Sequence, residues 1–138
     1  MIGSGETLVH PIYIDDLVEG MIQAYQSEKA QGNVYILGGP KYVTLNQWVE
    51  IIAKEAGVEL SKTHIPYIPM KIISSICEKV FTAFGMEPPI FRRHVDFYIK
   101  NKAYSTERAA RDFGFAPKVG LTEGTRKTVA WYREHGLL

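Results

Sequence analysis

Two adjacent arginines, Arg92 and Arg93, are the residues of this sequence best suited to holding an anionic ligand. They follow the run Pro88-Pro89-Ile90-Phe91, which interrupts a helical pattern. Guanidinium groups bind phosphates and carboxylates through paired N–H donors. Arginine side chains are more often solvated at the surface. The pair is therefore a candidate anion-binding site, and a surface pair is the alternative interpretation.

A tyrosine four residues before a lysine is a second pattern with chemical meaning, and Tyr98 and Lys102 have this spacing. A lysine ammonium next to a phenol lowers the pKa of the phenol, so that the tyrosine exchanges a proton with a substrate hydroxyl or carbonyl. The same spacing arises at any lysine-rich helix end. We favour this second, structural interpretation.

Gly3-Ser4-Gly5 is the one segment that resembles part of a dinucleotide-binding turn. Such a turn needs a preceding strand and a third glycine, so that amides at a helix N-terminus reach the pyrophosphate. Both are missing here, and residues 6–10 have an extended pattern. We interpret the segment as a structural turn and predict no cofactor-binding residue in this chain.

Histidines, the cysteine and neighbouring carboxylates form no further catalytic pattern. The four histidines are scattered and Cys77 is the single cysteine, so the spacing of metal ligands is not found. Asp15 and Asp16 are adjacent and do not share a helix face. Asp15 is better explained as a helix N-cap. The sequence predicts neither a metal site nor a carboxylate dyad.

The length and composition are those of one globular domain. The 138 residues are 46% hydrophobic and 22% charged, with a net charge of +1, so no charge excess indicates a nucleic acid or an anionic membrane as partner. The single cysteine excludes an intrachain disulfide and favours a reducing compartment. The N-terminus lacks signal-peptide features, and prolines and charges interrupt the apolar stretch Ile65 to Phe84. We expect a cytoplasmic protein without nucleic-acid or membrane partners.

Periodicity predicts a strand–helix–strand element at the start of the chain. Residues 8–14 predict a short strand, and Asp15 is the expected cap of the following helix. A second strand is predicted over Val34 to Leu37. The helix between them has one apolar stripe at helical spacing, formed by Leu17, Val18, Met21, Ile22 and Tyr25.

Four helices are predicted in the rest of the chain. The first begins at a capping box of Thr44 and Gln47 and ends at Gly57, and the second has Pro69 at its first helical position. The third is capped by Ser105 and ends at Gly114, and the fourth begins at Thr122 and ends at Gly136. Apolar residues at helical spacing predict a core that contains Trp48, Ile52, Ile76, Val80, Phe81, Val129 and Tyr132.

Taken in order, these segments resemble the C-terminal part of an extended short-chain dehydrogenase/reductase. The group contains NAD(P)-dependent sugar epimerases and dehydratases, with hydroxysteroid-dehydrogenase-like and dihydroflavonol-reductase-like relatives. The segments that carry the resemblance are Gly3-Ser4-Gly5, His10 to Leu17, Asn33 to Gly39, Phe113 to Pro117 and Trp131-Tyr132. In the family, the catalytic tyrosine and lysine precede the segment that matches His10 to Leu17. Tyr98 and Lys102 follow it, so no catalytic residue is expected in this chain.

The resemblance implies an α/β fold: a helix-rich C-terminal fragment of a Rossmann-type enzyme with two or three short strands. Residues 1–40 would be the last strand–helix–strand of the Rossmann half. Residues 41–138 would form a single, helical substrate-binding part. NAD or NADP would bind to the parent enzyme, and no cofactor is expected for this chain alone.

The function implied is the substrate-binding part of an NAD(P)-dependent epimerase, dehydratase or reductase, catalytically incomplete as this chain. Its substrate would be a sugar, a nucleotide sugar or another hydroxyl or carbonyl compound, contacted by His10, Tyr13, Arg92 and Arg93. Nucleotide-sugar members usually have Arg-Asp-Tyr or Arg-Asp-Phe where this chain has Val9-His10-Pro11. That departure favours the hydroxysteroid-dehydrogenase-like and dihydroflavonol-reductase-like branch.

Two further expectations concern partners. A non-enzymatic small-molecule or protein-interaction domain derived from such an enzyme is the alternative function. The strand over 34–37 and the apolar helix before it would lack the Rossmann half that covers them, so we expect the chain to form a homo-oligomer.

Overall fold

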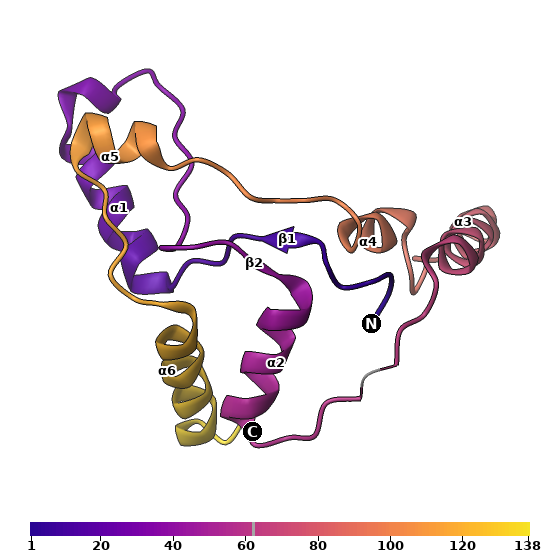
Figure 1. The fold of residues 1–138 in the computed structure, drawn as a ribbon. Helices are drawn as coiled ribbons and strands as arrows, with labels where there is room; N and C mark the ends of the chain where they lie inside the picture. Colours follow the sequence, from indigo (N-terminus) through magenta and orange to yellow (C-terminus); the bar gives the residue numbers. More distant parts are fainter. Residues whose placement is uncertain (62) are drawn as a thin grey trace.

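The computed structural model describes residues 1–61 and 63–138, except for the side chain of Arg92. Figure 1 shows a helical body and an arm, made of α3 and α4, that projects from it. In chain order the elements are β1 (Leu8–Val9), α1 (Ile14–Gln26), the 3-10 helix η1 (Glu28–Ala30), β2 (Val43–Thr44), α2 (Leu45–Ala56), α3 (Tyr67–Ala83), α4 (Arg92–Phe97), α5 (Glu107–Phe113) and α6 (Leu121–Glu134). The predicted helix-rich α/β architecture with few short strands is confirmed.

The two strands form one short antiparallel ladder. Leu8 lies opposite Thr44, and Val9 opposite Val43. The strand predicted over 34–37 is wrong, because these residues form neither helix nor ladder with the rest of the described chain. A strand requires the N–H and C=O groups of a neighbour, and 83% of the surface of Val34 faces solvent.

α1 begins two residues before its predicted first position, Asp16. Tyr13 is the N-cap, and Asp15 lies inside the first turn, so the predicted cap at Asp15 is wrong. The neighbouring Asp16 is only 5% exposed. Its carboxylate accepts hydrogen bonds from the backbone N–H groups of Lys118 (3.0 Å) and Val119 (2.8 Å). Asp16 therefore fastens α1 to the loop before α6.

The capping box of α2 is confirmed. Thr44 Oγ1 accepts the N–H of Gln47 at 3.2 Å, and Gln47 Oε1 accepts the N–H of Thr44 at 3.0 Å. Each bond satisfies a backbone donor that the first turn of a helix leaves unpaired. Gly57 ends α2 with a φ of 73°, as predicted.

Three other helix starts differ from their predicted positions. Thr106 is the N-cap of α5 in place of Ser105, and Gly120 precedes α6, which begins one residue before Thr122. Pro69 is the third residue of α3, not the first. The predicted glycines do end the last two helices, since Gly114 and Gly136 both have positive φ.

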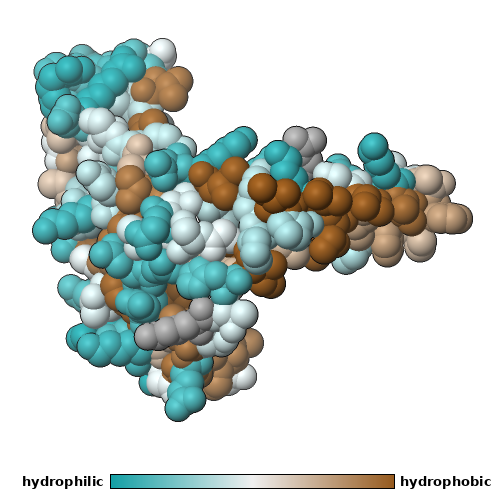
Figure 2. All heavy atoms as spheres, turned by 45° about the vertical axis from the view of Figure 1, so that its right-hand side comes forward, coloured by the Kyte–Doolittle hydropathy of each residue, from teal (hydrophilic) through white to brown (hydrophobic). Residues whose placement is uncertain are grey.

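α3 packs on α4 to form the arm. Ser74 of α3 and Val95 of α4 are fully buried, and the hydroxyl of Tyr67 donates to Asp96 Oδ1 at 2.7 Å. The opposite face of α3 is uncovered, and Figure 2 shows hydrophobic atoms gathered along this arm. The exposed apolar residues of the arm include Ile68, Ile72, Ile73, Ile76, Val80 and Phe84.

The predicted core is largely wrong. Val129 is buried, whereas Trp48 and Phe81 are half-buried and Ile52, Ile76, Val80 and Tyr132 are exposed. Helical spacing finds the apolar stripe of a helix, but it does not show whether a neighbouring element covers that stripe. The apolar residues that are buried lie mainly in β1, α2, α5 and α6, and they include Val9, Leu45, Ala53, Ala109, Phe115 and Val129.

Candidate functional site

His10 lies directly after β1, against the backbone of Gly38 and Gly39. Its Nε2 is 2.9 Å from the carbonyl oxygen of Gly39. A Cβ atom on Gly38 would lie 2.7 Å from the imidazole ring, so only glycine allows this approach. His10 Nδ1 is buried and has no hydrogen-bond partner among the described residues. The histidine thus holds the 38–39 turn beside β1.

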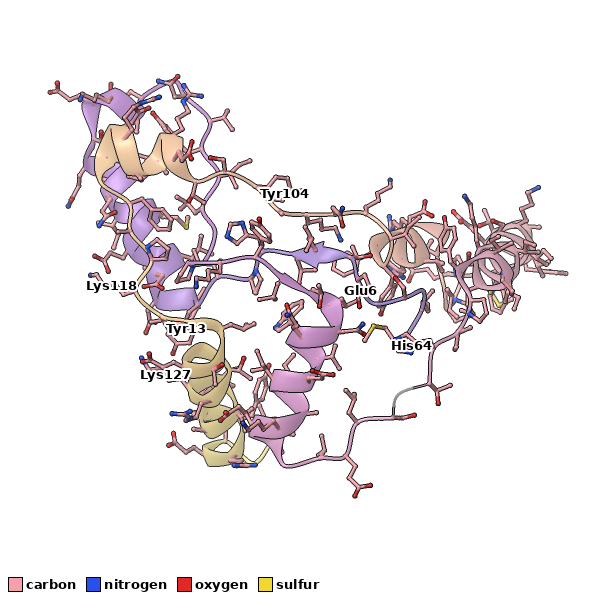
Figure 3. The ribbon with its side chains drawn as sticks, in the orientation of Figure 1. Glu6, Tyr13, His64, Tyr104, Lys118 and Lys127 are labelled. Carbon is pink, nitrogen blue, oxygen red and sulfur yellow. The ribbon has the colours of Figure 1, made fainter. Side chains whose placement is uncertain are left out.

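An open depression lies next to this histidine. It is lined by His10, Lys41, Tyr42 and Tyr104, among others, and the rings of His10 and Tyr42 meet edge to face with centroids 6.2 Å apart. Figure 3 shows Tyr104 on the segment that joins α4 to α5. Hydroxyls and an ammonium group can bind hydroxyl, carbonyl or anionic ligands. The sequence predicted only His10 here, because its neighbours come from distant segments without a shared motif.

Tyr13 lines a different cavity, between α2 and α6. Its ring packs on Gly124, where a Cβ atom would lie 3.1 Å away. The Lys127 ammonium lies 5.3 Å from the centre of the same ring (Figure 3). A hydrogen bond to Glu123 raises the pKa of Lys127. The structure therefore does not bring Tyr13 and His10 into one site.

The two arginines lie at the start of α4, on the arm. The guanidinium carbon of Arg93 is 4.4 Å from the ring centre of Phe91, a cation–π contact. Arg93 is exposed and forms no ion pair within the described chain. The side chain of Arg92 lies outside the described part. The body carries β1 and the arm carries α4 (Figure 1), so Arg93 and His10 belong to separate regions.

Tyr98 and Lys102 do not form a proton-transfer pair. The ammonium of Lys102 lies over the ring of Phe97 and donates to the carbonyl oxygen of Phe97 at 3.3 Å. Burial, and then repulsion from Lys100, lowers the pKa of Lys102. The backbone carbonyl of Tyr98 accepts the hydroxyl of Thr7. These groups join the arm to β1 and have a structural role.

The Gly3-Ser4-Gly5 turn does not fit a dinucleotide. The N–H of Gly3 donates to Ile65 at 2.9 Å, and the carbonyl of Gly5 accepts the N–H of Asn46 at 2.9 Å. The side chain of Asn46 occupies the space where a Cβ on Gly5 would lie. No helix begins at this turn, so its amides are not arranged to hold a pyrophosphate. The turn joins the N-terminus to α2 and to the segment before α3.

A polar network fastens residues 33–35 to α5, and no motif in the sequence predicts it. The hydroxyl of Tyr35 donates to Asp112 Oδ2 at 2.9 Å, and Arg111 pairs with Asp112 Oδ1 at 2.9 Å. The hydrogen bonds from Arg111 and Tyr35 lower the pKa of Asp112. Burial, followed by the bond to Asp112, raises the pKa of Tyr35. Tyr35 is consequently not an exposed position of a strand edge.

Exposed apolar side chains lie along one side of α1, and two more lie on residues 34–36. Half of the surface of Ile22 and most of that of Val34 are exposed. Monomeric soluble proteins seldom expose large continuous apolar patches unless another molecule or domain binds there. The exposed apolar residues of this surface are Ile14, Val18, Met21, Ile22, Tyr25, Val34 and Ile36. We call this set the α1 face.

The described part of the chain contains neither a cluster of metal-ligand side chains nor a membrane-spanning helix. No group of three or more histidine, cysteine or acidic side chains there is arranged to hold a metal ion. No helix in residues 1–61 or 63–138 combines the length and apolarity required to cross a bilayer.

The chain is similar to curated proteins over nearly its whole length but spans less than half of theirs. It is 28% identical over 137 residues to the uncharacterized protein YbjS of Escherichia coli. This alignment covers 97% of the chain and 41% of YbjS. It is 25% identical to 2-alkyl-3-oxoalkanoate reductase of Stenotrophomonas maltophilia, over 94% of this chain and 41% of the reductase. It is 28% identical to dTDP-glucose 4,6-dehydratase of Streptomyces griseus, over 96% of this chain and 32% of the dehydratase. No protein-family model matches the chain.

Solved structures give the same result. The crystal structure of gox2253 superposes with a TM-score of 0.73 at 25% identity, over 100% of this chain and 40% of that one. UDP-glucuronic acid 4-epimerase of Bacillus cereus, solved in complex with NAD, has a TM-score of 0.64 at 17% identity, over 98% and 34%. This chain is similar in sequence and fold to the C-terminal part of NAD-dependent epimerases, dehydratases and reductases, as the order of its segments predicts.

Proposed function

We propose that this chain is the substrate-binding C-terminal part of an NAD(P)-dependent epimerase, dehydratase or reductase. In this proposal the chain is catalytically incomplete, and a Rossmann half supplies the cofactor and the catalytic tyrosine and lysine. The observation that carries the proposal is the extent of the similarity, which takes in 94% or more of this chain but at most 41% of each relative described above.

The α1 face is the proposed contact with the Rossmann half. In our assignment, residues 1–40 complete that half and residues 41–138 form the substrate-binding part. The apolar side chains of α1 and of residues 34–36 have no cover within the described chain. Burying such side chains stabilises an interface by about 25 cal/mol for each Å² removed from water. A neighbouring strand would also pair with residues 34–37, which lack one here.

The proposed substrate is a sugar, a nucleotide sugar or another compound with a hydroxyl or carbonyl group. The depression that contains His10 offers hydroxyls and the Lys41 ammonium for such groups. Arg92 and Arg93 are proposed to bind an anionic part of the substrate, and Tyr13 remains a proposed contact. When bound to the other half, NAD(P) would supply hydride transfer; this chain would bind and orient the substrate. The single free thiol, Cys77, is in keeping with a reducing compartment such as the cytoplasm.

The test is reconstitution with a Rossmann half. We would co-express the chain with the part of Escherichia coli YbjS that precedes the region of similarity, and measure complex formation by sedimentation and NAD(P) binding by calorimetry. We expect a one-to-one complex that binds NAD(P), whereas the chain alone does not. Ile22→Glu should abolish the complex. Val58→Glu is the matched control, since Val58 is equally exposed but follows α2, outside the α1 face.

Two results would contradict the proposal. A chain that binds NAD(P) by itself would show that it is not the cofactor-free part. A chain that forms no complex with any Rossmann half, yet binds a small molecule or protein by itself, would favour the non-enzymatic interaction domain.

A further inference from the structure

The cavity between α2 and α6 shares Tyr13 and Lys41 with the contacts described above, since Lys41 also lines the depression that contains His10. Its volume is about 460 Å³, within the range of roughly 300–1,000 Å³ typical of small-molecule sites. Segments from both ends of the chain form it: the residues before α1 and β2, the two helices, and the last two residues. The residues that line it include Lys41, Trp48, Ile52, Thr125, Thr128 and Tyr132.

The helices are fixed around this cavity by contacts outside it. Arg133 donates to the carbonyl of Ala56 at 2.9 Å, and Arg126 pairs with Glu55 at 3.2 Å. Neither arginine lines the cavity. At the mouth, Ile52 remains 39% exposed and Tyr132 41% exposed. The two helices are therefore held in place while apolar side chains between them stay accessible.

The walls of the cavity are mostly apolar, and their polar groups include a few hydroxyls and one ammonium. The hydroxyl of Thr128 donates to the carbonyl of Gly124 at 2.8 Å, so its hydrogen is already used. Among the described residues that line the cavity, Lys41 is the one charged side chain and no acidic side chain is present. Lys41 is exposed at the rim and has no ion pair within the described chain.

We propose that this cavity binds an organic monocarboxylate with an apolar body. The hydrocarbon would lie against Trp48, Ile52 and Tyr132, where water is displaced from apolar surface. The carboxylate would remain at the rim, where the Lys41 ammonium offsets its charge without full loss of hydration. A ligand with a buried charge is disfavoured because nothing inside the cavity would pair with it. The proposal requires neither a cofactor nor a Rossmann half, although it shares Lys41 with the depression that contains His10.

The chain has a built-in reporter for this site. Trp48 lines the cavity, whereas the other tryptophan, Trp131, is stacked on His135 at 4.1 Å and does not line it. In a Trp131→Phe background the fluorescence of Trp48 is read alone. We would titrate this protein with decanoate and, separately, with decanol, which has the same chain without the charge. Saturable change is expected with both, and tighter binding with decanoate.

Two matched pairs of variants test the parts of the proposal. Lys41→Met should weaken decanoate up to about fivefold and leave decanol unchanged, while Lys54→Met, on α2 outside the cavity, should change neither. Thr125→Phe should fill the cavity and weaken both ligands by about tenfold or more. Thr122→Phe, on the exposed part of α6, is its control. Circular dichroism checks that each variant keeps its helices.

Amide shifts in a two-dimensional NMR spectrum of the unsubstituted chain supply an independent measurement, which no folding defect can affect. Shifts that cluster on α2 and α6 around the cavity support the proposal. Shifts on α3 or on the α1 face would show that decanoate binds exposed apolar surface and would overturn it. The absence of saturable binding would do the same, and an unchanged decanoate affinity in Lys41→Met would overturn the recognition of the carboxylate.

Discussion

Asp16 shows how one buried side chain joins two distant parts of this chain. Its carboxylate accepts two backbone N–H groups from the loop before α6. Charge-assisted hydrogen bonds of this kind are stronger than neutral ones, and the amides would be left unpaired without it.

We expect Asp16→Ala to lower the free energy of unfolding by roughly 1–3 kcal/mol, measured by urea titration. Asp15→Ala is the control, since Asp15 is exposed on the same helical turn and has no such bonds. Equal losses in the two variants would assign the effect to the start of α1 and not to the tie with the loop.

Asp112 is the residue that links the fold to pH. Its pKa lies below the ordinary value of 3.8, first because of the hydrogen bond from Arg111 and then because of that from Tyr35. A carboxylate with a lowered folded pKa stabilises the fold above its unfolded pKa and loses that contribution as pH falls through the folded value.

We therefore expect the free energy of unfolding to fall below about pH 4, and Asp112→Asn to make this fall smaller. Urea titrations from neutral to strongly acid pH measure it. Glu59→Gln, which neutralises an exposed carboxylate after α2, is the matched control. An Asp112→Asn chain with the same acid dependence as the parent would contradict the prediction.

At the scale of elements, α3 has one face that is buried against α4 and one face that is exposed to solvent. One packs on α4, around buried Ser74 and Val95, and the other exposes a row of isoleucines to solvent. Helical spacing alone does not distinguish these faces, because both are rich in apolar residues.

We expect Ile76→Glu to change the free energy of unfolding by less than about 0.5 kcal/mol, because 58% of Ile76 is exposed. Val95→Ala should cost roughly 1.5 kcal/mol, since it removes two buried methyl groups. Urea titration compares them directly. A large loss in Ile76→Glu would mean that the α3 row is covered in solution, by another copy of the chain or by a different packing of the arm.

At the scale of the whole molecule, the chain exposes more apolar surface than its own helices cover. The α1 face and the outer row of α3 both lack cover within the described residues. Large exposed apolar patches favour association. This remains the reason for expecting the isolated chain to self-associate.

We expect sedimentation at increasing concentration to show a shift from monomer to dimer or larger species, and Ile36→Lys to weaken it. Ile36 is exposed, whereas the neighbouring Tyr35 is held by a hydrogen bond to Asp112, so a substitution at Ile36 leaves that contact in place. Val58→Lys, an exposed apolar position outside the patches, is the control. A well-folded chain that remains strictly monomeric at high concentration would contradict the expectation.

Local signals in the sequence determined where several helices of this protein begin and end. The capping box of Thr44 and Gln47 and the terminating glycines Gly57 and Gly114 act through backbone bonds within a few residues, so their types and spacing suffice to predict them. The order of short segments likewise predicted the similarity to NAD-dependent epimerases, dehydratases and reductases.

Only the tertiary structure decided what covers each face and which side chains meet. The strand over Val34 to Leu37 is not formed because a strand requires a partner, and the isoleucines of α3 are exposed because no described element packs on them. His10 and Tyr13 are three residues apart, yet they line different cavities. The cavity between α2 and α6 draws on residues from both ends of the chain. Such contacts depend on long-range packing, which the spacing of residues along one helix or strand does not encode.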